Sequence, residues 1–512
     1  MEASSRVALN TGILYIRMLI TIGISLFAVR LVLKELGNID FGILNLVAGV
    51  VVFLSFLSTA MATSTQRYLS FYQGQSDLKM QRTVFSNSLL LHMLLGLLIV
   101  LLLFLLEDLI FRNFFNIPSE RQAAAEVIYH YMAFTAFFTI ASVPFNGVLI
   151  ARENMFWVAI INIVEAFLRL GIALAIHYFR VADKLIFYGQ LMLLTAIIVF
   201  VLYAVFCYLK YDECRLNLVP WLDKGMCKQL GAFAGWNMFG SLCGVGRNQG
   251  LAFILNYYNG VSLNTAYAIG NQVGYQLNFL SATLLRALNP QIMKSEGAGD
   301  RERVIRLSLM ASKFGFFLSV ILAVPCFFEM DHLLEFWLGV VPPYTSIFCS
   351  LIIASILVNQ LTIGLQSAIQ AVGQINVYQV VVGLVLLLNI PLAIIALSLH
   401  YNPSSVLWIA IMVELLACVL RVYFAKRIVG MQLSEYLNRV LLKEILPLIC
   451  IVLVSYLITR LFHFHLRFLL TFFIAGMAFL GSAYFFGLCT DEKELVKKNW
   501  TKLYSRFRLS QV

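Results

Sequence analysis

The sequence predicts an all-α polytopic membrane protein with about 14 transmembrane helices. Hydrophobic residues make up 61% of the 512 residues and charged residues only 12%, against roughly 25% charged residues in a soluble domain. Apolar runs of about twenty residues, the length that a helix needs to cross a bilayer, recur from one end of the chain to the other. The first run is too long for a cleavable signal peptide.

Fourteen spans are expected, and most of the connections between them are short. The expected spans cover residues 11–33, 41–65, 83–106, 123–150, 155–179, 184–209, 229–255, 261–290, 304–330, 344–372, 376–398, 404–426, 444–462 and 466–488. Loops on the side of the N-terminus hold about three times as many Lys and Arg residues as the opposite loops. This bias predicts that both termini are cytoplasmic. The acidic loop around Glu329, Asp331 and Glu335 then lies outside.

Two stretches of the chain match each other at a shift of 223 positions without a gap. The matched pairs are Gly37 with Gly260, Phe56–Ser58 with Phe279–Ser281, Gly74 with Gly297, and Asp77 with Asp300. Six spans in each half give both halves the same orientation. The sequence therefore predicts two parallel six-helix repeats, a plan in which the transport site lies between the halves.

The predicted organisation follows from these spans. An N-terminal six-helix lobe covers residues 1–209, a cytoplasmic linker 210–228, and a C-terminal six-helix lobe 229–426. Two extra transmembrane helices lie in 427–488, before a basic cytoplasmic tail, 489–512. In the tail, apolar residues recur at helical spacing at Val496, Trp500, Leu503 and Phe507. A helix lying on the anionic inner leaflet and a solvated tail are both open interpretations.

A polar stripe runs along the expected helix 261–290. Its members recur every three or four residues and so share one helix face; they are Asn264, Tyr267, Asn271, Tyr275, Asn278, Ala282, Arg286 and Asn289. Lipid would leave amide and guanidinium groups without hydrogen-bond partners, so the stripe must face other helices or a water-filled cavity. Asn271, Asn278 and Arg286 are therefore candidate substrate-binding residues.

Charged residues inside the expected spans are the strongest functional signal, because each costs about 2.5–3.5 kcal/mol at mid-membrane on insertion scales. Arg17, Arg247 and Arg286 have no acidic neighbour at helical spacing, and Arg247 shares a polar face with Asn248. Arginines that line a cavity without a local counter-ion suit an anionic ligand, particularly phosphate, which guanidinium binds with two parallel hydrogen bonds. We assign these four residues to substrate binding as well.

The other charges inside spans suggest ion coupling or gating. Glu165 and Arg169 are four residues apart and are expected to pair on one helix; a structural pair and a gating element are both open. Glu414 is the second acid deep in a span. Arg421 lies near a span end, where its side chain can extend to the membrane surface.

No catalytic constellation stands out in the sequence, so we expect no enzyme, no cofactor and no metal. There is no GxxxxGK[ST] phosphate loop, the nine cysteines form no CxxC pair, and only His463 and His465 approach a metal-ligand spacing. The net charge of +11 comes mostly from helix ends, which membrane topology explains better than nucleic-acid binding.

The stretch Ala8–Phe71 carries Gly37, Asp40–Gly42, Asn45 and Gln66–Tyr68. On these residues it resembles the Wzx-type polysaccharide and O-antigen flippases of the MOP (multidrug/oligosaccharidyl-lipid/polysaccharide) exporter superfamily. The resemblance continues over the chain in the number of spans and in the late element Gln366–Gln374.

The resemblance implies two six-helix lobes around a V-shaped cavity that opens alternately to each side of the bacterial inner membrane. The implied substrate is an undecaprenyl-pyrophosphate-linked oligosaccharide for surface polysaccharide, including lipopolysaccharide, and the implied partners are this lipid, membrane lipids and other polysaccharide assembly proteins. Cavity arginines of similar proteins fall here on Arg17 and Arg286. The extra helices resemble those that form a groove for the lipid tail.

Two other functions stay open beside the flippase. A cation-coupled multidrug antiporter of the same superfamily needs an intramembrane acid, whereas the cavity candidates here are mainly basic and amide side chains. A membrane glycan polymerase or acyltransferase needs catalytic groups in long outer loops, which the sequence lacks.

Overall fold

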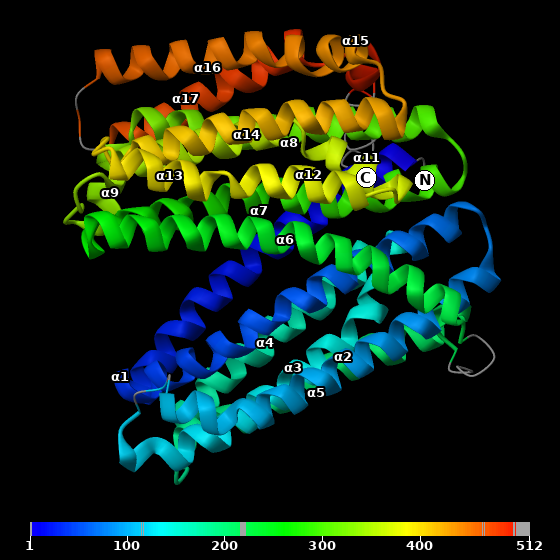
Figure 1. The fold of residues 1–512 in the computed structure, drawn as a ribbon, viewed down its shortest axis with the longest axis vertical. Coiled ribbons are helices and arrows are strands. Elements are labelled where there is room, and N and C mark those ends of the chain that lie inside the picture. The colour runs from blue at the N-terminus through cyan, green and yellow to red at the C-terminus, as the bar shows by residue number, and fades with distance from the viewer. Residues whose placement is uncertain are drawn as a thin grey trace, which may run out of the picture. The chain divides into compact units, whose positions relative to one another are not determined.

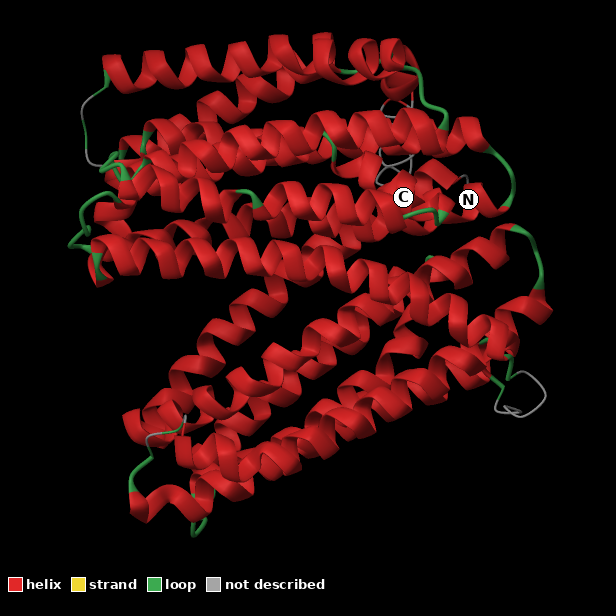
Figure 2. Ribbon diagram, viewed as in Figure 1, coloured by secondary structure: helices red, strands yellow, loops and turns green. Residues whose placement is uncertain are grey.

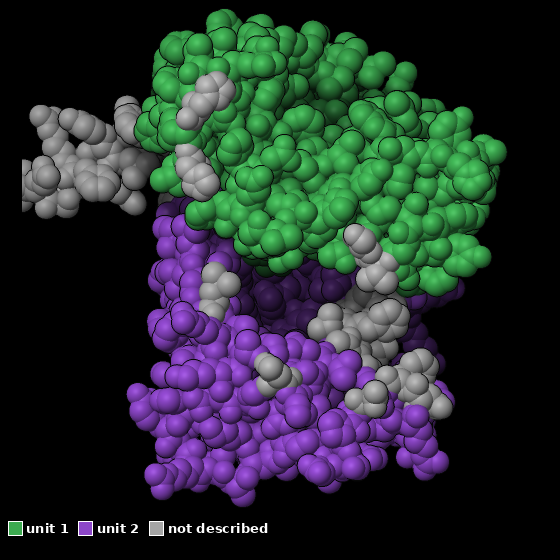
Figure 3. Space-filling model, turned by 90° about the vertical axis from the view of Figure 1, so that its left-hand side faces the viewer, with its two compact units in different colours: residues 1–7, 239–512 green, residues 8–238 purple. Residues whose placement is uncertain are grey.

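The computed structural model describes residues 3–113, 115, 117–215, 222–462, 464, 466–494 and 497. Within these ranges the regular elements are all helical (Figure 2). The chain divides into two compact units (Figure 3). The N-terminal unit is residues 8–238, and the C-terminal unit is residues 239–512 together with 1–7.

Long helices build the N-terminal unit. They are α1 (Ala3–Gly74), α2 (Leu78–Asn113), α3 (Gln122–Ala151), α4 (Met155–Tyr178), α5 (Lys184–Lys210) and the first part of α6 (Lys224–Asn259), with 3₁₀ turns at Ser119–Arg121 and Asp212–Cys214. One apolar core joins α1, α2 and α3 around Val47, Leu103 and Ile128. A second core includes Phe85 of α2, Leu149 of α3 and Leu230 of α6.

The C-terminal unit contains the rest of α6 and eleven further α-helices among the described residues (Figure 1). They are α7 (Val261–Gly297), α8 (Arg301–Phe328), α9 (Met330–Leu338), α10 (Thr345–Gln360), α11 (Ile363–Val372), α12 (Asn376–Leu387), α13 (Asn389–Ser398), α14 (Ser405–Phe424), α15 (Leu433–Tyr436), α16 (Leu442–Leu461) and α17 (Arg467–Ser482). Single π-helical turns follow α14, α15 and α17, at Ala425–Val429, Leu437–Leu441 and Ala483–Gly487. The two extra helices, α16 and α17, pack on α8 through a core that includes Val320, Ile451 and Phe479.

The protein is a polytopic helical membrane protein. Ten of the described helices are long and apolar enough to cross a membrane, and eleven if α10 and α11, which are bent by 44°, form one span. Helices α6 and α7 are as long but carry many polar residues. Within the residues that the structure describes with their side chains, the expected span 41–65 gives the apolar segment Ile39–Ala48. The expected total of fourteen spans and their orientation stay predictions.

The structure agrees with some expected boundaries and corrects others. Residues 11–33 and 41–65 lie on either side of a kink in α1 at Gly37, whose φ and ψ are not helical, as two separate spans require. The expected acidic loop after residue 330 contains α9. The expected span 376–398 is one candidate membrane span in the structure, Asn376–Ser398, with a turn at Leu388 between α12 and α13. Pro391 explains this turn, because it has no N–H to donate to the carbonyl of Leu387.

Backbone conformation recurs at the predicted shift of 223 residues. Gly37 has φ 73° and ψ 175°, and Gly260, just before α7, has φ 81° and ψ −178°. Positive φ is accessible to glycine at little cost, which explains why both positions carry it.

The two helix starts that follow also agree. Asp77 accepts a hydrogen bond from the Met80 backbone N–H at 3.0 Å, and Asp300 accepts one from that of Arg303 at 3.0 Å. Each carboxylate satisfies a backbone donor that the first turn leaves open. The full six-helix repeat remains a prediction. Val496, Trp500, Leu503 and Phe507 of the predicted tail, as well as His463 and His465, lie outside the described residues.

Candidate functional site

A cavity of about 90 Å³ lies in the C-terminal unit, between α6, α7, α10 and α14. Four of the predicted substrate-binding residues line it, namely Arg247, Asn248, Asn271 and Asn278. The other lining residues are Leu251, Tyr267, Gly274, Tyr275, Leu351, Ile352, Ser355, Ile356, Leu407 and Ala410. We call this space the α6–α7 pocket.

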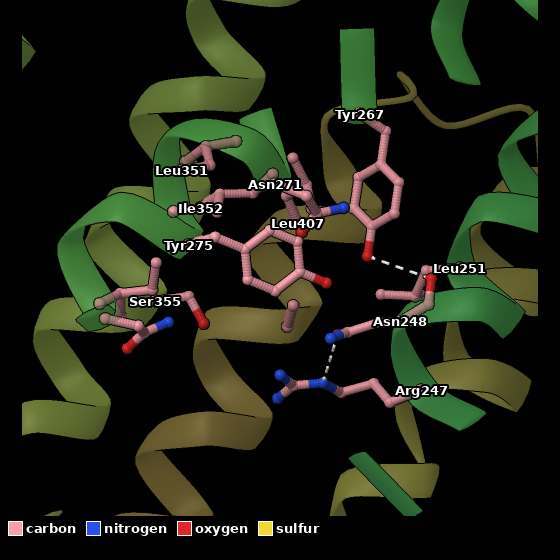
Figure 4. Close-up of a pocket in the computed structure, with 14 residues that line it drawn as sticks. Arg247, Asn248, Leu251, Tyr267, Asn271, Tyr275, Leu351, Ile352, Ser355 and Leu407 are labelled. Carbon is pink, nitrogen blue, oxygen red and sulfur yellow. Dashed lines mark hydrogen bonds between the residues drawn. The ribbon is translucent and has the colours of Figure 1, made fainter. Parts of the chain in front are cut away.

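The polar stripe of α7 forms one side of the α6–α7 pocket. Tyr267, Asn271, Tyr275 and Asn278 follow one another at steps of four, four and three residues, so one helix face presents them all. Figure 4 shows the side chains of Arg247 and Asn248 approaching this face from α6. The helical periodicity therefore predicted which α7 side chains share the cavity.

Hydrogen bonds hold several of the polar lining groups in place. The Arg247 Nε donates to Asn248 Oδ1 at 3.2 Å, and the Tyr267 hydroxyl donates to the Asn248 carbonyl at 3.4 Å (Figure 4). On the opposite side, Gln360 Nε2 donates to Asn278 Oδ1 at 3.2 Å. Positioned amide groups lose less side-chain entropy when a polar ligand binds.

A buried carboxylate joins two arginines behind the pocket. Glu414 on α14 accepts a hydrogen bond from Arg247 Nη1 at 2.9 Å through Oε2. Its Oε1 accepts from Arg421 Nη1 at 2.8 Å and from Asn359 Nδ2 at 2.8 Å. We call Arg247, Glu414, Arg421 and Asn359 the Glu414 cluster.

The Glu414 cluster corrects two expectations. Arg247 has a counter-ion, supplied by α14 rather than by its own helix. Arg421 is only 3% exposed and bonded to Glu414, so it does not extend to the membrane surface. With two guanidinium groups and one carboxylate, the cluster carries one more positive than negative charge.

The excess charge has access to the α6–α7 pocket through Arg247. Its side chain is 22% exposed, whereas those of Glu414 and Arg421 are almost fully buried. A positive charge in a site with little water acts strongly on a nearby anion. The site is thus suited to a group that carries negative charge and accepts hydrogen bonds.

The remaining predicted site residues lie elsewhere. Arg286, two turns beyond Asn278 on α7, is exposed and makes no hydrogen bond or ion pair with the part of the chain that the structure describes. Arg17 is buried in α1 of the N-terminal unit. Glu165 and Arg169 pair on α4 at 2.7 Å, as the spacing predicted, with both side chains partly exposed. Their roles stay predictions.

A second buried ion pair joins Glu329, which we expected in an outer loop, to Arg467 of α17. Glu329, at the end of α8, is fully buried and accepts from Arg467 Nε at 2.9 Å and Nη2 at 2.9 Å. The Thr471 hydroxyl donates to the same carboxylate at 2.7 Å, and Arg467 Nη1 donates to two backbone carbonyls, those of Thr459 and Phe462. We call this set the Glu329 cluster.

Sequence reasoning missed Ser355 of the pocket, and Arg421 and Asn359 of the Glu414 cluster. Arg421 follows Glu414 by seven residues, two helical turns, and this spacing was a usable signal for their pairing. Ser355 and Asn359 carry no such signal, because their relation to the site comes only from the packing of α10 against α7 and α14.

The N-terminal part of the chain matches a family model. Residues 15–176 match MatE. The crystal structure of a MATE point mutant is 13% identical with a TM-score of 0.72, covering 84% of this chain and 98% of that chain. An outward-facing multidrug resistance MATE family transporter of the MOP superfamily is 14% identical with a TM-score of 0.69, covering 82% and 95%.

A third similar structure is a MOP superfamily transporter from Pyrococcus furiosus Vc1, described by a reverse polarity of its binding pocket that suggests a different function. It is 12% identical with a TM-score of 0.71, covering 85% of this chain and 97% of that chain. At these identities the matches establish a MATE-like fold. The predicted resemblance to MOP exporters is therefore confirmed for the fold alone. No curated protein sequence matches the chain.

Proposed function

We propose that this protein is a flippase that moves an undecaprenyl-pyrophosphate-linked oligosaccharide across the bacterial inner membrane by alternating access. The observation that carries the proposal is the excess positive charge of the Glu414 cluster beside an amide-lined pocket. The MATE-like fold supports an exporter, and the polarity of the pocket supports the anionic substrate.

The lining of the pocket matches the chemistry of a sugar phosphate. Arg247 supplies charge-assisted hydrogen bonds to phosphate oxygens, and the amides of Asn248 and Asn271 both donate and accept, as sugar hydroxyls require. Tyr267 and Tyr275 offer aromatic faces beside them.

The volume limits what the pocket holds in this conformation. About 90 Å³ equals about three water volumes at roughly 30 Å³ each. One phosphate group fits such a space, whereas an oligosaccharide does not. We therefore place the phosphate nearest the glycan against Arg247, with the sugars and the lipid outside the pocket.

A cation-coupled multidrug antiporter is the second candidate, and the similar multidrug resistance transporter favours it. Such a mechanism needs an acid that can take up a proton or a cation. Both oxygens of Glu414 already accept hydrogen bonds from arginine side chains, so this acid is a poor cation site. We propose no catalytic role for the pocket.

Export assays in a strain that lacks the transporter separate the candidates. Arg247→Ala should abolish surface polysaccharide and strand lipid-linked units inside at normal membrane abundance, while efflux of cationic dyes stays at the level of the empty strain for both proteins. Arg460→Ala, at an exposed arginine of α16, is the matched control and should export normally. Normal export by Arg247→Ala, or dye efflux by the wild type, would overturn the proposal.

A further inference from the structure

A second group of charged side chains is buried where the end of the described chain meets α8 and α16. Lys313 of α8 is 1% exposed and donates hydrogen bonds to Glu492 Oε2 and, at 3.5 Å, to Cys489 Sγ. Glu492 also accepts from the Cys489 backbone N–H at 2.8 Å. Lys313 thus fastens the segment after α17 to α8.

Glu444, in the first turn of α16, is a second carboxyl next to Lys313. It is 3% exposed, and neither of its oxygens has a hydrogen-bond partner among the residues that the structure describes. Lys313 is the charged group whose field reaches it. Tyr436 of α15 also faces Glu444, but its hydroxyl donates to the Leu361 carbonyl at 3.1 Å.

The backbone around Glu444 offers no substitute donors. Leu441 and Leu442 have helical φ and ψ, so α16 continues the preceding π-helical turn rather than starting with open N–H groups. An ionised carboxylate without donors is very costly to bury, and such a group takes up a proton instead. The Lys313 ammonium does not remove this cost, because its short bond is to Glu492.

We propose that Glu444 is a proton-binding site that exchanges with the ion pair of Lys313. In the structure Glu444 holds the proton, and Lys313 pairs with Glu492. When Glu444 releases its proton to water, the new carboxylate competes for the Lys313 ammonium, which keeps all its own protons. Glu492 then loses its bond to α8, while Asp491 keeps its ion pair with Arg439 at 3.3 Å.

The elements involved give this exchange a mechanical consequence. Helix α8 packs against α7, which lines the α6–α7 pocket, and it also carries the core that holds α16 and α17. A proton on Glu444 therefore sets whether the segment after α17 is bonded to α8 through Glu492. The site does not depend on the proposed substrate.

Infrared difference spectroscopy of the purified full-length protein in nanodiscs tests the site. The wild type at neutral pH should show a carboxylic acid C=O band that shifts in D₂O and is lost in Glu444→Gln. Glu435→Gln is the matched control, because Glu435 lies on neighbouring α15 with a half-buried side chain paired to Arg439; its spectrum should keep the band. A wild type without the band, or a band that survives in Glu444→Gln, would overturn the proposal.

Cys489 reports on the exchange itself. In a variant that keeps only this cysteine, its reaction rate with a neutral maleimide is measured across pH. The rate should rise more steeply with pH than in the same variant with Glu444→Gln, where thiol ionisation alone acts and Lys313 stays on Glu492. Identical profiles in the two proteins would rule out the exchange.

Discussion

The Glu414 and Glu329 clusters both contain a buried carboxylate bound by arginine, and they differ in how many arginines each carboxylate meets. Each centres on a carboxylate that is at most 2% exposed and bound by arginine. Glu329 meets one arginine and one hydroxyl, with His332 Nδ1 farther away at 3.7 Å, and Nη1 of Arg467 donates to two backbone carbonyls. Glu414 meets two arginines, one of which borders the α6–α7 pocket.

The difference separates a structural ion pair from a binding site. The Glu329 cluster matches one buried carboxylate with one buried arginine, so it ties α17 to the end of α8 and leaves no unbalanced arginine beside a cavity. The Glu414 cluster has one unbalanced positive charge with access to a cavity. Removing one partner should therefore lower protein stability at the Glu329 cluster and impair transport at the Glu414 cluster.

The largest expected effect is on the stability of the closed cluster. Arg467→Ala leaves Glu329 buried without its counter-ion, and breaking a buried pair in this way costs about 3–5 kcal/mol. We expect a large fall in membrane abundance and in the thermal stability of detergent-solubilised protein. An Arg467→Leu, Glu329→Leu double variant should recover much of the loss. Wild-type stability of Arg467→Ala would contradict the comparison.

The next effect is on transport at the open cluster. Glu414→Gln keeps the size of the side chain but removes the negative charge and replaces one of the two accepting oxygens by an NH₂ donor, which leaves two guanidinium groups without a counter-ion. We expect tighter binding of the anionic substrate and slower release, measured as slower turnover in proteoliposomes with protein abundance close to normal. Faster turnover would show that Glu414 does not balance Arg247.

A smaller effect is expected from Arg286→Lys, at the exposed arginine of the α7 stripe. If it grips a pyrophosphate, Arg286→Lys should impair glycan export partly, because lysine keeps the charge and loses the planar fork. Arg286→Ala should then be nearly inactive. If Arg286 only contacts phosphates of the inner leaflet, Arg286→Lys should export glycan at the wild-type level. Full export by Arg286→Ala would show that Arg286 does not bind the substrate.

The smallest effect concerns a cluster in the N-terminal unit in which one arginine meets two carboxylates. Arg121 bonds to Asp183 at 2.6 Å and to Asp40 at 2.7 Å, and this hydrogen bonding holds the pKa of Asp183 below its usual range. A lowered pKa stabilises the fold above the unfolded pKa of about 3.9 and loses this contribution as pH falls through the folded value.

Water screens the ion pair at this partly exposed site, so its contribution to the free energy of unfolding is about 1 kcal/mol or less. Asp183→Asn should therefore lower thermal stability slightly at neutral pH and flatten its decline between about pH 5 and pH 2, the range set by the unfolded pKa. An unchanged pH profile would contradict the role of the Arg121 contacts.

Helical periodicity predicted one side of the site because it is a local property of the chain. Asn271 and Asn278 fall on one face of α7 in any helix with this sequence, and Arg247 falls beside Asn248. The counter-ion of Arg247 lies 167 residues away on α14, and that of Glu329 lies 138 residues away. Such partners are set by the packing of helices, so the sequence indicated a free Arg247 where the structure has an ion pair.

The central claim is that the excess charge of the Glu414 cluster binds a pyrophosphate head group. Calorimetric titration of the purified protein with a short-chain polyprenyl pyrophosphate, and with the matching uncharged polyprenol, tests it most directly. The wild type and the control Arg460→Ala should prefer the pyrophosphate, and Arg247→Ala should bind the two lipids about equally. An undiminished preference for the pyrophosphate in Arg247→Ala would contradict the account.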